Sequence, residues 1–242
     1  MTGFNERIVR SSRRSGSRLV LALDVSDIHE RRLHHAEKVL ASVKDEVAAV
    51  KLNHHLLLPF GLEGVRGIIG TCHDAGLPLI ADLKLNDIES TNVNAVGSLF
   101  KYGFDAFIAN PFVGYREGLG ATIDLAHARG RGVILLVYMS HRGAVEGYSL
   151  QVDGGRQLYQ VFAERAKHWR ADGVVVSAKS NAKVSETRKI VGEKCLIFSP
   201  GVGAQGGRVA AGVTPGADFI IVGRTIMESP NPAKVVRELN AE

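Results

Sequence analysis

Three charged residues of complementary type stand close together and could do chemistry. Asp82, Lys84 and Asp87 follow the apolar stretch 77–81, so the chain passes directly from an apolar run into charges. Side chains alternate along an extended chain, so Asp82 and Lys84 should point to the same side. Asp87 comes after the turn has begun and need not serve the same site, or the same subunit. Lys51, at the end of an earlier apolar run, is the residue best able to join them.

An array of lysines between carboxylates favours a particular kind of chemistry. Buried carboxylates are costly unless they are paired, and alternating signs keep each group charged at neutral pH. A lysine held in this way can stabilise a developing carbanion and then donate its proton. A fixed carboxylate beside a substrate carboxylate disfavours the ground state. A structural ion-pair network is the alternative, because an Asp-x-Lys-x-x-Asp pattern is only moderately specific.

A glycine-rich stretch near the C-terminal end predicts an anion site. Residues 199–207 read Ser-Pro-Gly-Val-Gly-Ala-Gln-Gly-Gly, and backbone amides approach an anion closely where glycine has no Cβ. The embedded Gly-x-Gly-x-x-Gly is not a dinucleotide fingerprint, which belongs in a first strand–helix turn before a long helix. Gln205 can hydrogen-bond ligand oxygens from this loop.

A second loop supports the same anion site. The apolar run 219–222 is followed by Gly223 and Arg224, and a guanidinium there can offer two parallel hydrogen bonds to a phosphate. Two ordinary turns are the alternative. The occurrence of both loops together favours a phosphate.

The elements that must position these residues form a regular series. Eight short apolar runs alternate with longer amphipathic stretches, such as 32–43, 91–102 and 158–169. The runs are nearly continuous in apolar residues, as strands covered on both faces require. They lie at 19–23, 48–52, 77–82, 106–109, 132–137, 173–176, 195–198 and 219–222. The series predicts an α/β fold, a (β/α)8 TIM barrel, with a doubly wound open sheet as the alternative.

The ends of these runs carry the residues expected in a barrel's active site. In such barrels the catalytic groups stand at the C-terminal ends of the strands. The residues at or just beyond the run ends are Asp24, Lys51, Asp82, Lys84, Asn110, Ser140, Pro200 and Arg224. We therefore expect them to surround one site.

Length and composition fit one domain spanning residues 1–242, with residues 1–18 as a solvated N-terminal lead-in. The formal charge of +5 suits an anionic ligand, but the arginine-rich segment 10–18 has no interleaved aromatic residues for base stacking. We therefore predict no nucleic-acid partner. No stretch is long and apolar enough to span a membrane, and no secretory signal is evident. With Cys72 and Cys195 as the only cysteines, we predict a cytoplasmic protein without disulfides.

The histidines do not predict a metal site. His34-His35 and His54-His55 are adjacent pairs whose side chains diverge on a helix, and the cluster 29–35 misses the metalloprotease spacing by one residue. We expect surface or packing roles for them. Only His141, beside Ser140, is expected near the site.

Taken together, the motifs resemble the orotidine 5′-phosphate decarboxylases, particularly the short microbial and archaeal forms. The likeness extends from about residue 18 to residue 239. It rests on the segments 21–24, 50–51, 82–92, 139–141, 200–207 and 222–224. Their combination and order are highly specific.

The resemblance implies a reaction and a set of roles. Orotidine 5′-monophosphate would be converted to UMP and CO₂ in de novo pyrimidine biosynthesis, with no metal and no cofactor. Lys84 would donate the proton to C6, and Asp82 would lie against the departing carboxylate. Lys51 and Asp87 would complete the charge array. Thr91, like Asp87, would reach into the partner subunit's site, which implies a homodimer with shared active sites.

The same resemblance implies how the substrate is bound. Asp24 and Lys51 would bind the ribose hydroxyls, and Ser140 the pyrimidine edge. Gln205, Gly223 and Arg224 would hold the phosphate. The remaining substrate-binding residues would be Ile88, Thr91, Pro200 and Val202.

The chain departs from the family's pattern in places. Glu89 and Ser90 replace the usual Pro-Asn, Arg142 stands where proline often follows Ser-His, and Asn86 replaces a commonly small residue. None of these removes a proposed catalytic group. The segment 142–155, rich in glycine and charge, is the expected lid.

Two other functions stay open. The first is an Mg²⁺-dependent sugar-phosphate decarboxylase or lyase of the same superfamily, against which Ile88 and Gln205 argue. The second is a non-catalytic barrel that binds phosphate or RNA, against which the intact charge array argues. Loss of activity in EDTA would favour the first, and salt-dependent RNA binding without turnover the second.

Overall fold

The computed structural model shows a closed barrel of eight parallel strands, which confirms the predicted (β/α)8 architecture. The structure describes residues 3–25, 31–201 and 216–241. Each strand pairs with the next along the chain, and β8 pairs with β1 to close the barrel. The strands are β1 (Leu19–Ala22), β2 (Ala49–Asn53), β3 (Leu79–Leu85), β4 (Ala106–Ala109), β5 (Gly132–Tyr138), β6 (Gly173–Val176), β7 (Leu196–Pro200) and β8 (Phe219–Val222).

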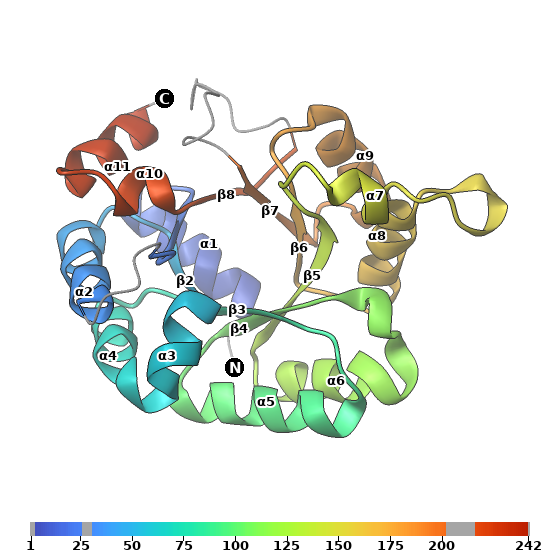
Figure 1. Ribbon diagram of the computed structural model, residues 1–242, viewed down its shortest axis with the longest axis horizontal. Helices are drawn as coiled ribbons and strands as arrows, with labels where there is room; N and C mark the ends of the chain where they lie inside the picture. Colours follow the sequence, from blue (N-terminus) through green and yellow to red (C-terminus); the bar gives the residue numbers. More distant parts are fainter. Residues whose placement is uncertain (1–2, 26–30, 202–215, 242) are drawn as a thin grey trace.

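Helices follow the strands and surround them (Figure 1). The predicted stretches 32–43, 91–102 and 158–169 correspond to α2, α5 and α8. The helices are α1 (Phe4–Ser15), α2 (Arg32–Val43), α3 (His54–Gly64), α4 (Arg66–Asp74), α5 (Glu89–Tyr102), α6 (Gly120–Ala128), α7 (Ala144–Tyr148), α8 (Leu158–His168), α9 (Asn181–Val191), α10 (Arg224–Met227) and α11 (Pro232–Ala241). Within the described ranges, no helix has the length and apolar character needed to cross a membrane.

The strands separate two apolar cores because alternate side chains point to opposite faces. In β1, Leu19 and Leu21 pack in the layer between the strands and the helices, whereas Val20 and Ala22 pack inside the barrel. Both sets are buried, which explains why the strands read as continuous apolar runs. The barrel interior is therefore a packed core, and a ligand can be received only at its ends.

Helix α1 closes one of these ends. Phe4 and Ile8 are buried in the same cluster as the inward-facing strand residues, and α1 lies across the middle of the ring in Figure 1. The exposed Arg10 and Arg13 fit the expectation of a solvated lead-in, but the segment also forms a helix with a buried face. Gly132, at the start of β5, leaves room for this plug, since a Cβ there would lie 2.4 Å from the Phe4 ring.

The same end of the barrel is held by carboxylates placed just before three of the strands. Asp105, Asp172 and Asp218 precede β4, β6 and β8, and each accepts a backbone N–H from the preceding strand. The donors are Leu79 at 2.9 Å, Val133 at 2.9 Å and Ile197 at 2.7 Å, in that order. Each of the three carboxylates also contacts a basic side chain.

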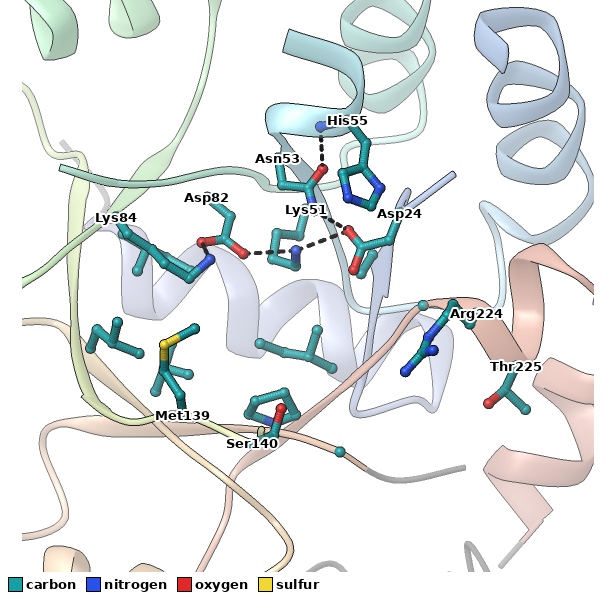
Figure 2. A pocket seen from close by; sticks show the side chains of 18 residues that line it. Asp24, Lys51, Asn53, His55, Asp82, Lys84, Met139, Ser140, Arg224 and Thr225 are labelled. Atoms are coloured by element: carbon teal, nitrogen blue, oxygen red, sulfur yellow. Dashed lines mark hydrogen bonds and ion pairs between the residues drawn. The ribbon is translucent and has the colours of Figure 1, made fainter. Parts of the chain in front are cut away.

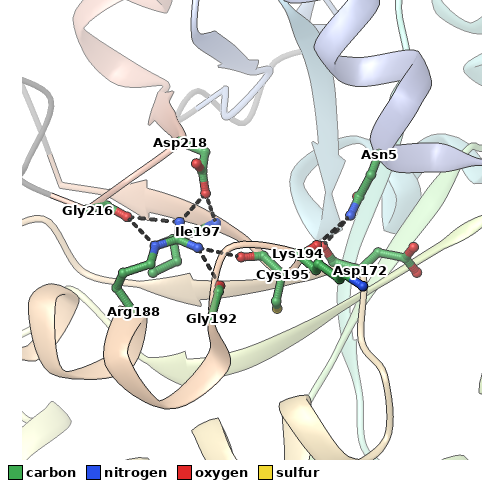
Figure 3. A network of polar contacts seen from close by, with 9 residues as sticks. All are labelled: Asn5, Asp172, Arg188, Gly192, Lys194, Cys195, Ile197, Gly216 and Asp218. Carbon is green, nitrogen blue, oxygen red and sulfur yellow. Dashed lines mark hydrogen bonds and ion pairs between the residues drawn. The ribbon is translucent and has the colours of Figure 1, made fainter.

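Arg188 shows how densely this end is connected (Figure 3). Its guanidinium contacts the Asp218 carboxylate and donates to the carbonyl oxygens of Gly192, Cys195 and Gly216. On the other side of the network, Asn5 of α1 donates to the carbonyl oxygens of Asp172 and Lys194. These contacts fix strand register at the N-terminal end, which leaves the opposite end for chemistry.

Candidate active site

A cavity of about 290 Å³ opens at the C-terminal ends of the strands (Figure 2). Its floor is apolar, formed by inward-facing residues such as Ile108, Leu136 and Val175, and its rim is polar. The sequence-predicted residues that line it are Asp24, Lys51, Asp82, Lys84, Ser140, Pro200, Gly223 and Arg224. The expectation that strand ends surround one site is met for these residues, which come from β1, β2, β3, β5, β7 and β8 or from just beyond them.

Four of the charged residues form a continuous chain of alternating sign along one wall. Lys51 Nζ lies 3.2 Å from Asp24 Oδ1 and 2.8 Å from Asp82 Oδ2. The other oxygen of Asp82 accepts from Lys84 Nζ at 2.7 Å. Figure 2 shows this order across the cavity, from Asp24 through Lys51 and Asp82 to Lys84.

The two inner members of the chain are buried and stay charged. Burial by itself would lower the pKa of Lys51, but the charges of Asp82 and Asp24 outweigh it, so the pKa of Lys51 is raised. Burial would likewise raise the pKa of Asp82, but the charges of Lys51 and Lys84 outweigh it, so the pKa of Asp82 is lowered. The lysine is therefore an ammonium and the aspartate a carboxylate at neutral pH.

Lys84 reaches this chain through an unusual backbone conformation. Its φ of 50° lies in the left-handed region, and the pairing of β3 with β4 shifts register between Ala81 and Leu85. The contact of Lys84 with Asp82 confirms that the two side chains point to the same side, although the strand is irregular where they meet. Strained backbone of this kind costs about 1–3 kcal/mol.

The end of the cavity beyond Asp24, away from Lys84, carries the residues expected to bind phosphate. Gly223, Arg224 and Thr225 line the cavity at the start of α10, and Pro200 and Gly201 line it at the end of β7. Gly201 has a φ of 103°, which favours glycine, and a Cβ added there would lie 3.4 Å from the Ser140 side chain and 3.5 Å from that of Lys179. Val202 and Gln205, also predicted to bind the substrate, lie outside the described residues.

Four of the predicted residues do not line this cavity. Asp87, Ile88 and Thr91 stand where β3 leads into α5, and all three are exposed. The Asp87 carboxylate accepts the Ile88 backbone N–H at 2.7 Å, and the Ile88 side chain is 62% exposed. Asn110, expected at the rim, is also absent from the lining and instead caps the turn after β4 by accepting from Phe112 N–H.

Some lining residues were missed in the sequence. Asn53 and His55 line the cavity, so the expectation of a surface or packing role was wrong for His55. His141, expected near the site, is exposed beside the lining residue Ser140 and does not itself line the cavity. The spacing of Asn53, two residues beyond Lys51 on the same strand, was a usable signal. No comparable indication in the sequence pointed to His55, because its position at the cavity depends on the direction in which α3 begins after β2.

The arrangement can perform proton transfer but shows no metal cluster. In the part of the chain that the structure describes, no group of three or more His, Cys, Asp or Glu side chains is placed to hold a metal ion. Cys72 and Cys195 are buried, and burial raises the pKa of each thiol to about 12, so neither is a nucleophile. What the cavity offers is an ammonium at one end, a guanidinium at the other, and an apolar floor between them.

Comparison with known proteins extends over nearly the whole chain. A sequence model described as the orotidine 5′-phosphate decarboxylase / HUMPS family matches residues 17–239. An orotidine 5′-phosphate decarboxylase of Methanosarcina barkeri is 38% identical over 224 residues, which are 93% of this chain and 93% of the relative. That of Pyrococcus abyssi is 37% identical, over 93% of this chain and 98% of the relative.

Solved structures agree with these sequence matches. The crystal structure of orotidine 5′-phosphate decarboxylase from Pyrococcus horikoshii has a TM-score of 0.74 and 34% identity, covering 92% of this chain and 97% of the other. The enzyme from Methanocaldococcus jannaschii, complexed with the inhibitor BMP, has a TM-score of 0.77 and 30% identity, covering 93% and 97%. The range matched by the family model, residues 17–239, spans all eight strands.

Proposed function

This chain belongs to the orotidine 5′-phosphate decarboxylase / HUMPS family, and we propose that it converts orotidine 5′-monophosphate to UMP and CO₂ in de novo pyrimidine biosynthesis, without metal or cofactor. The observation that carries the proposal is the alternating chain from Asp24 to Lys84 on one wall of the cavity. Its two positive groups are held by carboxylates, so the array has an ammonium available without any added ion.

Lys84 is the proton donor in the proposed reaction. When the bond between C6 and the carboxylate breaks, CO₂ leaves and the electron pair stays on C6. The Lys84 ammonium stabilises that charge and transfers a proton to C6, which leaves a neutral amine. The Lys84 side chain is 33% exposed, so the amine can recover its proton from solvent. Lys51 is only 4% exposed and is held between two carboxylates, which makes it the poorer donor.

Asp82 contributes through its position between the two lysines. A substrate carboxylate that lies near Lys84 also lies near the Asp82 carboxylate, whose lowered pKa keeps it negative. Two carboxylates at close range repel each other, and the repulsion is relieved when CO₂ departs. Asp82 therefore disfavours the bound ground state relative to the transition state.

The rest of the cavity is assigned to the remainder of the nucleotide. We assign the phosphate to Gly223 and Arg224 together with Gln205, and the pyrimidine edge to Ser140. The ribose hydroxyls are assigned to Asp24 and Lys51. Pro200, Val202 and Ile88 complete the proposed binding residues. The support is that Arg224 and Lys84 line one cavity, so phosphate binding can position a distant ring for reaction.

The protein is proposed to act as a homodimer with shared sites. Asp87 and Thr91 are exposed in the chain and do not line its own cavity, so they are free to enter the cavity of a second copy. Large apolar side chains are exposed after β2, β3 and β4, at the same end of the barrel. They are Leu58, Ile88, Phe112 and Tyr115. A cytoplasmic location stays a prediction from composition.

Turnover in the presence of a chelator tests the proposal. The purified protein is incubated with orotidine 5′-monophosphate in EDTA, with and without excess Mg²⁺, and UMP is followed by chromatography. We expect equal rates of UMP formation in all samples. No UMP under any condition would overturn the proposed substrate. Turnover that stops in EDTA and returns with Mg²⁺ would overturn the metal-free mechanism. It would favour the Mg²⁺-dependent chemistry of the sugar-phosphate decarboxylases and lyases.

A further inference from the structure

Asn53 connects the charge array to the start of the next helix. It is the last residue of β2, two positions beyond Lys51. Its amide nitrogen Nδ2 donates to Asp24 Oδ1 at 2.7 Å, and its Oδ1 accepts the backbone N–H of His55 at 2.8 Å (Figure 2). The side chain thus caps α3 and contacts the site in the same conformation.

These two contacts fix which way the amide faces. The His55 backbone N–H can only donate, so the oxygen of the amide must face it, and the Asp24 carboxylate can only accept, so the nitrogen must face Asp24. An aspartate at position 53 would keep the cap but lose the donor. A serine would also keep the cap but would be too short to reach Asp24.

The contacts have a consequence for the two oxygens of Asp24. Oδ1 receives hydrogen bonds from both Lys51 and Asn53. Oδ2 of Asp24 accepts neither of these hydrogen bonds. It lies next to Gly223, since a Cβ added to Gly223 would be 3.2 Å from Oδ2. The carboxylate is therefore clamped through one oxygen, and the other is left toward the cavity as a hydrogen-bond acceptor.

We propose that Asn53 is a positioning residue that aims Oδ2 of Asp24 at the ribose hydroxyls of the bound nucleotide. This role rests on the proposed function, because it takes the ligand to be a ribonucleotide. Lys51 alone cannot fix the carboxylate, since it is shared with Asp82 and holds Asp24 at the longer of its two contacts. Asn53 supplies the second point that stops the carboxylate from rotating.

The test measures how much the effect of Asn53 depends on the ribose hydroxyls. Asn53→Asp and Asn53→Ser are compared with the wild type in calorimetric binding of UMP and of 2′,3′-dideoxy-UMP. We expect each variant to bind UMP roughly tenfold more weakly, the scale of one hydrogen bond to a charged group. The dideoxy nucleotide, which has no hydroxyls for Asp24, should bind all three proteins equally. The KM for orotidine 5′-monophosphate should rise more than kcat falls.

A matched control separates this role from a purely structural one. Asn231 accepts the backbone N–H of Lys234 at the start of α11 and does not line the cavity, so Asn231→Asp makes the same chemical change elsewhere. It should leave both affinities unchanged. Equal weakening of UMP and dideoxy-UMP in the Asn53 variants, or no weakening of either, would overturn the positioning role.

Different results would overturn the role of Asn53 and the proposed function. If the wild type decarboxylates orotidine 5′-monophosphate but the Asn53 variants bind UMP normally, only the role of Asn53 is overturned. If the wild type neither turns over this substrate nor binds UMP, the proposed function is overturned and the role of Asn53 falls with it.

Discussion

At the scale of single residues, the order of charges decides which lysine can act. Lys51 contacts two carboxylates, and Asp82 contacts two ammonium groups, so each inner member has an oppositely charged partner on both sides. Lys84 contacts only Asp82 among the described residues, although its ammonium has three N–H bonds to offer. The exposed end of the array is therefore the end with the most N–H bonds left for a substrate.

Replacement of Lys84 tests this assignment. We expect Lys84→Ala to lower kcat by at least about three orders of magnitude, because the variant loses both the proton donor and the charge that stabilises the carbanion. UMP should still bind measurably through the phosphate end of the cavity. Steady-state rates and UMP titrations check both statements.

A surface lysine provides the control for that measurement. Lys234 of α11 is largely exposed and pairs loosely with Glu238 at 3.7 Å, so Lys234→Ala should behave as the wild type. Turnover of Lys84→Ala within tenfold of the wild type would remove Lys84 from the mechanism.

The residue scale also shows the limit of what the sequence could predict. Asp82 and Lys84 were identifiable because opposite charges directly after an apolar strand are expensive unless they are paired. The left-handed backbone at Lys84 could not be predicted, because it occurs at a register shift between two strands that are adjacent only in the folded barrel. Asn53 was missed because its importance comes from Asp24, 29 positions earlier in the chain.

At the scale of elements, buried strands were predictable and the plug helix was not. All eight strands lie within two or three residues of their predicted ends, because strands buried on both faces need continuous apolar residues. Helix α1 buries only Phe4, Ile8 and Ser11, and its remaining residues are mostly serine and arginine. Three buried residues are too few for the sequence to predict an amphipathic helix, because the surface that α1 packs against exists only in the folded barrel.

Removal of the aromatic plug tests the contribution of α1. Phe4 is 1% exposed and packs over Gly132, so Phe4→Ala should lower the free energy of unfolding by about 3 kcal/mol. Because Phe4 lies at the end of the barrel opposite the cavity, KM should not change at temperatures where the variant is folded. Chemical denaturation and steady-state kinetics are the measurements.

The same helix offers the control. Glu6 of α1 is exposed, so Glu6→Ala should change stability by less than about 0.5 kcal/mol. A similarly small effect of Phe4→Ala would mean that α1 does not plug the barrel in solution.

At the scale of the whole molecule, the two ends of the barrel differ in the use of charge. At the N-terminal end, the carboxylates before β4, β6 and β8 accept backbone N–H groups and contact basic side chains, so these charges stabilise the packing of the strands. At the C-terminal end, the Asp24–Lys84 chain ends in a partly exposed ammonium, and Arg224 faces the same cavity. The fold thus separates charges that stabilise it from charges that remain available to a ligand.

The proposed shared site belongs to the dimer rather than to one chain, and mixed dimers test it. One chain carries Asp82→Asn and the other Asp87→Asn, each with its own affinity tag, so that heterodimers can be purified. If Asp87 serves the partner's cavity, one site of the heterodimer receives both substitutions and the other receives neither. The heterodimer should then have about half of the wild-type activity, although each homodimer is nearly inactive.

The alternative geometry predicts a different result for the same heterodimer. If Asp87 serves its own chain's cavity, each site carries one substitution and no activity returns. A heterodimer of Asp82→Asn with Lys84→Ala is the matched control, because both residues contact each other within one chain's cavity and neither site can be intact. Recovery in the first pair and none in the second requires Asp87 to cross the interface. Equal inactivity of the two heterodimers would instead confine each site to one chain, and the dimer would not be needed for chemistry.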